Sequence, residues 1–410
     1  MPIVFVHGVN VRKDEEGRYT RAEQRRDAFF KECVLTSIAA DPKRLVVYNP
    51  YWGGHAATFP WDHGALPEAE YETFGAEAGL EATELLPALS LAGVLGEGEA
   101  PPPANGVLPW LARRGIEAAT DFLVLTATDP SIDEFVDADA VARLARAVGA
   151  YAFVHRDAPP SWLDQVATNE AFIDRLAAEV QAWGAGAVPA GAETRWESFG
   201  AGDQAWRSLR DTAGRIRRAA VKLERGQFRS RVRDPLHKNL AQFLGDTFVY
   251  LNERGTAEAP GPIVQDVIEA LEAADAQRRG TPEPLIVVAH SMGGNIMYDV
   301  LTYFRPSINV DYFVTVGSQV ALFEELKLFK ISDATIPNGI KQVSKPRNVQ
   351  RWLNVFDHHD VLGFVTGKVF ADTTDVEYTT GSWLFGAHGA YFTQPSFHHR
   401  LAARVQEGRV

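Results

Sequence analysis

The 410-residue sequence predicts an α/β protein built on a mostly parallel, doubly wound sheet. Short apolar runs of strand length alternate with helical patterns near both ends of the chain, which is typical of a parallel sheet with helices on both faces. A long central segment does not follow this alternation. A chain of this length exceeds the size at which a single core usually stops growing, so we expect a large insertion or a second lobe.

Five apolar runs are the expected strands of this sheet. They are Ile3–Val6, Leu45–Tyr48, Leu285–Ala289, Val310–Val316 and Val349–Phe356. Helical patterns follow the first and the third of these runs, at about 20–40 and about 292–304. We therefore assign residues 1–51 and 236–410 to the core that contains the sheet.

The central segment, residues 52–235, is predicted to be a helical insertion that caps the core. It is rich in Ala, Glu and Arg, and its helical patterns are interrupted by breaks such as residues 96–106. Its last part leads into residues 206–238, which hold eleven basic and three acidic residues, with apolar residues at three- and four-residue steps. Two interpretations stay open there: a cap helix packed on the body, or a peripheral contact with anionic membrane lipids.

Charge and composition exclude several classes of function. A net charge of −12, from 41 basic and 53 acidic residues, argues against nucleic-acid binding by the whole molecule. Residues 1–8 lack the pattern of a signal peptide, and the most apolar stretches, 80–96 and 107–127, contain charged residues. We therefore expect a cytoplasmic protein.

The single cysteine, Cys33, excludes an intramolecular disulfide and is expected to be a buried thiol on a helix face.

A serine stands between an all-apolar strand and a helix, in the sequence Ala289-His290-Ser291-Met292-Gly293. Small residues two positions before and after this serine suit a sharp strand-to-helix turn, where larger side chains would collide with a strained backbone. The pattern predicts that Ser291 is a nucleophile. His290 is expected to pack rather than to act as the base, because adjacent side chains point away from each other.

Two backbone amides are expected to stabilise the oxyanion that nucleophilic attack would create. One is the N–H of Met292, at the start of the helix after the serine. The second should come from a loop after another strand, and the sequence Phe5-Val6-His7-Gly8-Val9 fits this position. Gly8 would permit close approach of the backbone, which makes the N–H of Val9 the best second donor.

The strand that ends in His7-Gly8 and the serine turn around Ser291 resemble the α/β-hydrolase superfamily. The resemblance implies that the first strand corresponds to the family's third, so that the sheet lacks the family's first edge strands. It also implies the chain order of serine, then acid, then histidine. The matching motifs cover about 1–50 and 236–395, whereas the insertion carries no such motif.

The same resemblance identifies an acid and a base. The stretch Asn354–Val361 is similar to the Asn-x-x-x-x-x-Asp-Pro-Val segment of lipases and intracellular phospholipase A1-like acylhydrolases, with valine in place of the proline. This implies Asp360 as the acid, with Asp357 as the alternative. The segment 381–391 is similar to the His-x-x-Tyr ending of the same groups and implies His388 as the base.

Two further features belong to this comparison. The histidines His398 and His399 are the alternative bases. The segment from Gly317 to Gln319 is similar to a Gly-Ser-Pro-Leu segment of phospholipase-like members, with glutamine where proline is usual.

These residues together predict a serine hydrolase that cleaves carboxylic esters through an acyl-enzyme. Ser291 would attack, His388 would act as base and then as acid, and Asp360 would orient the imidazole. The resemblance favours a lipase or phospholipase-like enzyme with an ester or lipid substrate. A soluble short-chain esterase or thioesterase is one alternative, and a non-catalytic binding or scaffold protein of the same fold is another.

No cofactor and no metal ion are expected in this protein. His358 and His359 are adjacent, so in an extended loop their side chains would point in opposite directions. No spaced set of histidine and carboxylate ligands accompanies them.

Overall fold

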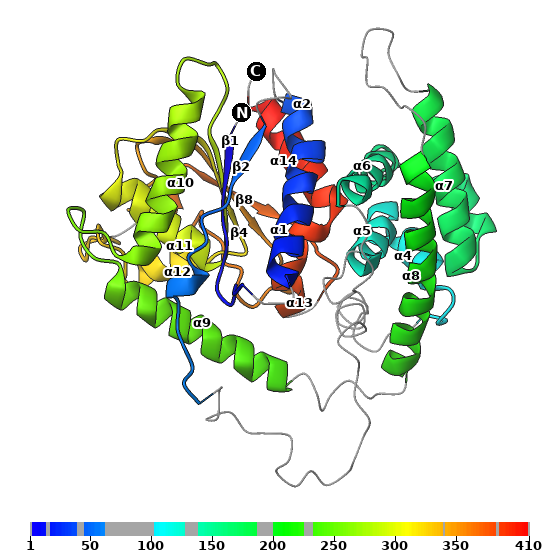
Figure 1. Cartoon of the computed structure of the whole chain (residues 1–410), viewed down its shortest axis with the longest axis horizontal. Helices are drawn as coiled ribbons and strands as arrows, with labels where there is room; N and C mark the ends of the chain where they lie inside the picture. Colours follow the sequence, from blue (N-terminus) through cyan, green and yellow to red (C-terminus); the bar gives the residue numbers. More distant parts are fainter. Residues whose placement is uncertain are drawn as a thin grey trace, which may run out of the picture. The chain divides into compact units, whose positions relative to one another are not determined.

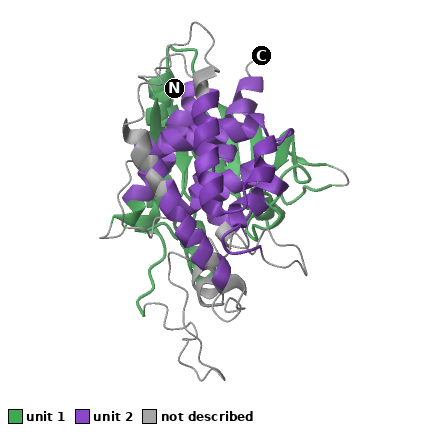
Figure 2. Ribbon diagram, turned by 90° about the vertical axis from the view of Figure 1, so that its right-hand side faces the viewer, with its two compact units in different colours: residues 1–19, 39–76, 231–379 green, residues 20–38, 77–230, 380–410 purple. Residues whose placement is uncertain are grey.

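The computed structural model describes residues 2–13, 17–38, 45–61, 102–127, 138–186, 200–224, 233–338, 341–382 and 385–408. The chain divides into two compact units, which are coloured in Figure 2. Unit 1 comprises residues 1–19, 39–76 and 231–379. Unit 2 comprises residues 20–38, 77–230 and 380–410.

Unit 1 is an α/β unit around a six-stranded, fully parallel sheet with the strand order β2-β1-β3-β4-β6-β8. The strands are β1 (Pro2–Val6), β2 (Val46–Tyr48), β3 (Ile286–His290), β4 (Val310–Val316), β6 (Val349–Phe356) and β8 (Thr373–Glu377). The five apolar runs all form strands, so this part of the prediction is confirmed. Residues along β1, β3 and β4 are almost all buried, as expected for strands covered on both faces.

The structure adds strands that the sequence pattern did not predict. β8 has the sequence Thr-Thr-Asp-Val-Glu and is partly exposed at the edge of the sheet, so no apolar run marks it. A separate two-stranded sheet pairs β5 (Val343–Ser344) with β7 (Phe370–Ala371).

Helices of unit 1 cover one face of the sheet, as Figure 1 shows for α10 and α11. The described helices of unit 1 are α9 (Arg233–Glu253), α10 (Pro262–Arg278), α11 (Met292–Asp299) and α12 (Val320–Glu325), with a short 3-10 turn, η3 (Gly53–His55). A π-helical turn, η5 (Val300–Phe304), continues α11, so the helix predicted at about 292–304 is confirmed. One apolar core joins the sheet to these helices through residues such as Val264, Leu271, Val287 and Phe313.

The strand order reverses between β1 and β3. From β1 the chain goes outward to the edge strand β2 and later returns to β3 on the other side of β1. Open α/β sheets bind their ligands outside the carboxyl ends of the strands at such a switch point. The loops that follow β1 and β3 therefore occupy the position where a site is expected.

Unit 2 is helical in its described residues. Its longer helices are α4 (Val107–Arg114), α5 (Ile116–Ala127), α6 (Ala138–Val154), α7 (Asn169–Gly186), α8 (Gly200–Glu224) and α14 (Pro395–Glu407), with the short η4 (Ser161–Gln165), α13 (Phe385–Ala390) and η6 (Tyr391–Thr393). Most of α1 (Arg18–Phe29), with η1 (Phe30–Leu35) and α2 (Thr36–Ile38), also belongs to this unit. Residues 20–38 and 380–410 thus group with the helical unit, whereas the sequence assigned them to the core.

The amphipathic helix predicted from residue 206 onward is α8. Its apolar stripe is buried in the core of unit 2, at Trp206, Leu209, Ala213, Ile216 and Ala220. On its other side Arg210 forms an ion pair of 2.7 Å with Asp174 of α7, and Arg217 and Arg218 are exposed. Residues 225–232, which carry further basic residues of the predicted lipid contact, lie outside the described part of the chain.

Two observations bear on the function classes. None of the helices among the described residues combines the length and the apolar character needed to span a bilayer. Cys33 is buried, and desolvation raises the pKa of its thiol to about 12, which confirms the expectation of a buried cysteine.

A buried carboxyl group in unit 2 makes the stability of this protein depend on pH. Asp121 in α5 accepts hydrogen bonds from Ser396 of α14, at 3.2 Å from its N–H and 2.5 Å from its Oγ. Burial raises the pKa of Asp121 from 3.8 to about 7. Between these two values the folded protein keeps the proton that the unfolded chain releases, so the free energy of unfolding falls as pH rises.

The substitution Asp121→Asn should remove this pH dependence, because the amide carries no titrating proton. Relative to the wild type, the variant should gain about 2–3 kcal/mol of unfolding free energy between pH 5 and pH 8. Urea unfolding at the two pH values measures the difference. Asp157→Asn is the control, since the Asp157 side chain is 84% exposed and should leave the dependence unchanged. Parallel pH profiles for Asp121→Asn and the wild type would contradict the assignment.

Candidate active site

Ser291 forms a strained turn between β3 and α11. Its backbone angles are φ 54° and ψ −128°, a region that residues other than glycine rarely adopt. The surrounding hydrogen bonds hold it there: its N–H donates to the Val316 carbonyl at 2.9 Å, and its carbonyl accepts from the Ser318 hydroxyl at 2.8 Å. The Ser291 Oγ is buried and makes no hydrogen bond within the described residues.

Close packing against the end of β1 explains two of the glycines. A Cβ on Gly293 would lie 2.4 Å from the Val6 carbonyl oxygen, and a Cβ on Gly8 would lie 2.6 Å from the Cβ of Ser291. The sequence pattern attributed the small residue at 293 to the turn itself. In the structure Gly293 is required because the first turn of α11 packs against the backbone of β1.

The loop after β1 is fixed by a stacked pair, His7 and Trp52. The rings are 4.7 Å apart, and the Trp52 indole N–H donates to the His7 carbonyl. The His7 Nε2 accepts from the Trp52 backbone N–H, while Nδ1 donates to the Gly8 carbonyl. These contacts assign His7 the neutral tautomer with the proton on Nδ1, and they make it a structural residue of this loop.

The two predicted oxyanion donors lie on elements that meet at Ser291. Val9 directly follows Gly8, which contacts Ser291. Met292 is the first residue of α11, where backbone N–H groups have no partner inside the helix. A helix N-terminus with such N–H groups favours negative charge.

Both candidate acids lie in the loop that follows β6, and both are buried. One Oδ of Asp357 accepts from the backbone N–H of His359 at 2.9 Å and from its ring Nδ1 at 3.2 Å. One Oδ of Asp360 accepts from the Leu362 N–H at 2.9 Å. A Cβ on Gly363 would lie 3.2 Å from the other Oδ of Asp360, so the glycine leaves room beside that oxygen. Asp357 thus contacts a histidine of its own loop, and the choice of Asp360 over Asp357 as the acid stays a prediction.

Buried polar residues connect this acid loop to the serine turn. The Gln319 side chain donates to the Leu362 carbonyl at 2.6 Å and accepts from Asn295 of α11 at 3.3 Å. The backbone carbonyl of Ser318, whose hydroxyl holds Ser291, accepts from the Phe364 N–H at 3.1 Å. The glutamine in place of the usual proline therefore has a role in this structure, which the sequence comparison did not suggest.

A buried asparagine of β6 and a partly buried aspartate of β8 hold the acid loop, and the sequence analysis assigned no role to either. Asn354 of β6 donates to the Phe364 carbonyl at 2.8 Å and to Asp375 of β8 at 2.7 Å. Asp375 in turn accepts from the N–H groups of Thr366 and Gly367. Asn354 is the first residue of the segment that resembles lipases, whereas no sequence pattern marked Asp375.

The predicted base, His388, lies in α13 of unit 2 and is largely buried. Ser291 and Asp360 lie in unit 1, so the pairing of His388 with them stays a prediction. The alternative bases are poorly suited, because burial lowers the pKa of His398 to about 3 and of His399 to about 4. A general base works best with a pKa near the operating pH.

Among the described residues, no three or more His, Cys, Asp or Glu side chains are grouped so as to hold a metal ion. The chain matches no known family model, no curated protein and no solved structure. The chemistry of the site therefore has to follow from its own residues.

Replacing Ser291 by glycine should stabilise the protein relative to replacing it by alanine. Glycine adopts a positive φ without strain that costs other residues about 1–3 kcal/mol, although its greater backbone entropy offsets about 0.5–1 kcal/mol. We expect Ser291→Gly to exceed Ser291→Ala by about 1 kcal/mol in unfolding free energy, measured by urea titration.

Ala289, two residues upstream in β3, provides the control comparison of alanine with glycine. Ala289→Gly should lower the free energy of unfolding relative to the wild type, because residue 289 lies in an ordinary buried strand. A Ser291→Gly variant that is less stable than Ser291→Ala would contradict the strained turn.

Proposed function

We propose that this protein is a serine hydrolase of the α/β-hydrolase type that cleaves carboxylic esters through an acyl-enzyme. The observation that carries the proposal is Ser291, a strained and buried serine between a parallel strand and a helix. Strain of this kind persists only where the surrounding structure enforces it, and it is concentrated at functional sites. The position of Ser291 beside the strand-order reversal further supports a catalytic role.

In the proposed reaction, the Ser291 Oγ attacks the ester carbonyl carbon while His388 accepts the hydroxyl proton. The carbonyl oxygen becomes an oxyanion, which the N–H groups of Val9 and Met292 stabilise. The bond to the leaving alcohol then breaks, and His388 returns the proton to that alcohol. Water next attacks the acyl-serine ester by the same route and releases the acid. Asp360 holds the imidazole and stabilises its charged form.

For the substrate we propose only a class, an ester or a lipid. The proposed enzyme is a lipase or phospholipase-like acylhydrolase that acts in the cytoplasm on an ester or lipid. Exposed arginines of α8, such as Arg217 and Arg218, support a peripheral contact with anionic membrane through residues 206–238. The burial of the apolar stripe of α8 favours the simpler role of a packed helix for the same segment.

A fluorophosphonate probe tests the nucleophile directly. The folded wild-type protein should form one covalent adduct on the peptide that contains Ser291, and mass spectrometry identifies that peptide. The Ser291→Ala variant and the heat-unfolded wild type should form none. Folded wild-type protein without an adduct would contradict the proposal and would favour a non-catalytic binding protein.

The two candidate acids are separated by paired substitutions. Asp360→Asn should lower kcat for a p-nitrophenyl ester about 10³–10⁴-fold, because an amide cannot stabilise the imidazolium. Asp357→Asn should lower kcat less than about tenfold, since Asp357 braces its own loop through His359. Steady-state kinetics on both variants provides the measurement. The reverse ranking would make Asp357 the acid.

A further inference from the structure

The carboxylate of Asp246, on α9, holds the loop that carries one of the proposed oxyanion donors. Its side chain is fully buried. One oxygen accepts from the Asn10 N–H at 3.0 Å, and the other accepts from the Ala57 N–H at 3.0 Å. The Arg12 guanidinium donates to both oxygens, at 2.6 and 3.3 Å. Each oxygen thus accepts two hydrogen bonds, which compensate the burial of the charge.

Asp246 holds the loop at a residue with an unusual backbone conformation. Asn10, one residue after the proposed donor Val9, has a φ of 60°. Apart from glycine, asparagine is one of the residues that adopt this left-handed region most readily, and the hydrogen bond from its N–H to Asp246 fixes it there. The neighbouring segment also packs tightly, since a Cβ on Gly53 would lie 1.9 Å from the Val11 carbonyl oxygen.

The same helix also contacts α11, which carries the second proposed donor. The Tyr250 hydroxyl of α9 and the guanidinium of Arg254, the residue that follows this helix, donate to Asp299 of α11 at 2.8 and 2.7 Å. One turn closer to Asp246, Thr247 contacts the sulfur of Met292 at 3.8 Å. α9 therefore joins the loop after β1 to the first turn and the last residue of α11 through buried polar contacts.

We propose that Asp246 is a positioning residue that sets the distance between the Val9 and Met292 amides of the oxyanion hole. This inference rests on the proposed function. Oxyanion donors act only within about 2.7–3.1 Å of the developing charge, and a displacement of about 1 Å can cost about 100-fold in rate. Asp246 touches neither Ser291 nor the substrate in this account. Its substitution should therefore weaken the stabilisation of the transition state only by moving the loop after β1.

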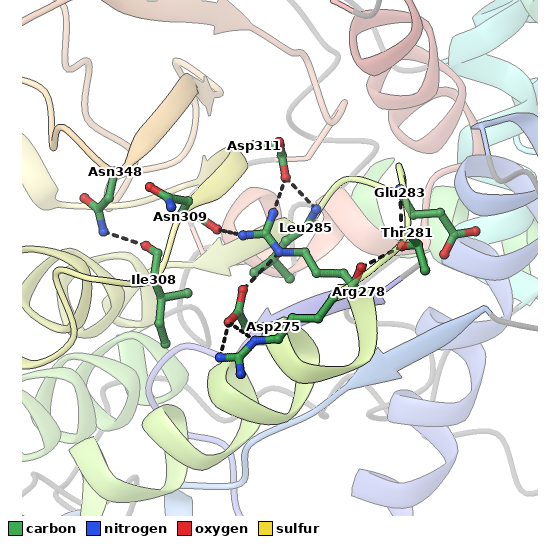
Figure 3. A network of polar contacts seen from close by, with 10 residues as sticks. Asp275, Arg278, Thr281, Glu283, Leu285, Ile308, Asn309, Asp311 and Asn348 are labelled. Atoms are coloured by element: carbon green, nitrogen blue, oxygen red, sulfur yellow. Dashed lines mark hydrogen bonds and ion pairs between the residues drawn. The ribbon is translucent and has the colours of Figure 1, made fainter.

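The test compares Asp246→Asn with a matched variant, Asp311→Asn. Asp311 lies near the start of β4, at the amino ends of the parallel strands, whereas Ser291 lies at their carboxyl ends. It too accepts from an arginine and a backbone N–H, at 2.6 Å from Arg278 and 2.8 Å from Leu285, as Figure 3 shows. Both substitutions remove a carboxylate that an arginine and a backbone N–H hold, although Asp311 is 31% exposed and Asp246 is fully buried.

We expect Asp246→Asn to lower kcat for a p-nitrophenyl ester about 10–100-fold with KM within about twofold of the wild type. Affinity for an alkyl boronic acid, which mimics the tetrahedral intermediate on serine, should fall by a similar factor. Asp311→Asn should keep kcat and boronic-acid affinity within about twofold, whatever its effect on thermal stability.

A second variant covers the case in which Asp246→Asn does not fold. Arg12→Lys keeps the positive charge but loses the two-pronged contact of a side chain that is about one-third exposed. It should lower kcat about threefold to tenfold with an unchanged KM. Unchanged kcat in a folded Asp246→Asn, or in Arg12→Lys when the former does not fold, would overturn the inference.

The same experiment separates this inference from the proposed function. A wild-type protein that neither hydrolyses the ester nor binds the boronic acid would overturn the proposed function, and the inference with it. An active wild type whose Asp246 and Asp311 variants lose kcat equally would leave the function standing and overturn the role of Asp246.

Discussion

The carbonyl oxygens of Val6 and His7 face Gly293 so closely that no side chain fits between the end of β1 and the first turn of α11. Gly8 packs equally closely against Ser291. This contact joins two strands that are neighbours in the sheet and lie on opposite sides of the strand-order reversal. It brings the loop after β1 to the serine and helps hold the serine backbone at its positive φ.

Buried polar contacts extend this arrangement outward on both sides. On the side of β4 and β6, Gln319 and Asn354 hold the loop of Asp360 to the backbone around Ser318 and to the edge strand β8. On the other side, Asp246 of α9 holds the loop after β1. Because each of these groups is buried with its hydrogen bonds made, the loops at this edge of the sheet have a defined geometry, which catalysis by fixed dipoles requires.

The sequence predicted the parts of unit 1 that depend on local pattern. Val310–Val316 and Val349–Phe356 are strands with the predicted bounds, since buried parallel strands read as apolar runs. The sequence predicted the serine turn because its small residues lie within five positions of one another. The sequence did not predict β8, because an edge strand with the sequence Thr-Thr-Asp-Val-Glu needs no apolar run.

Contacts between distant positions were beyond the reach of sequence pattern. Asp246 lies 236 residues from Asn10, and Asn354 bonds to Asp375 across 21 residues, so no spacing rule relates them. The grouping of residues 380–410 with the helices of unit 2 is of the same kind, since it depends on which surface α14 packs against. The roles of single polar residues such as Asp246 and Asn354 can be assigned only once the fold shows their partners.

The central claim is that Ser291 forms a covalent acyl-enzyme. Acid quenching of the folded protein during turnover of a p-nitrophenyl ester, followed by mass spectrometry of its peptides, measures this most directly. The account predicts a peptide that contains Ser291 and is heavier by the mass of the acyl group, present in the wild type and absent from Ser291→Ala. Ester turnover that depends on the folded protein, with no acyl group on this peptide or with an acyl group on another residue, would contradict it.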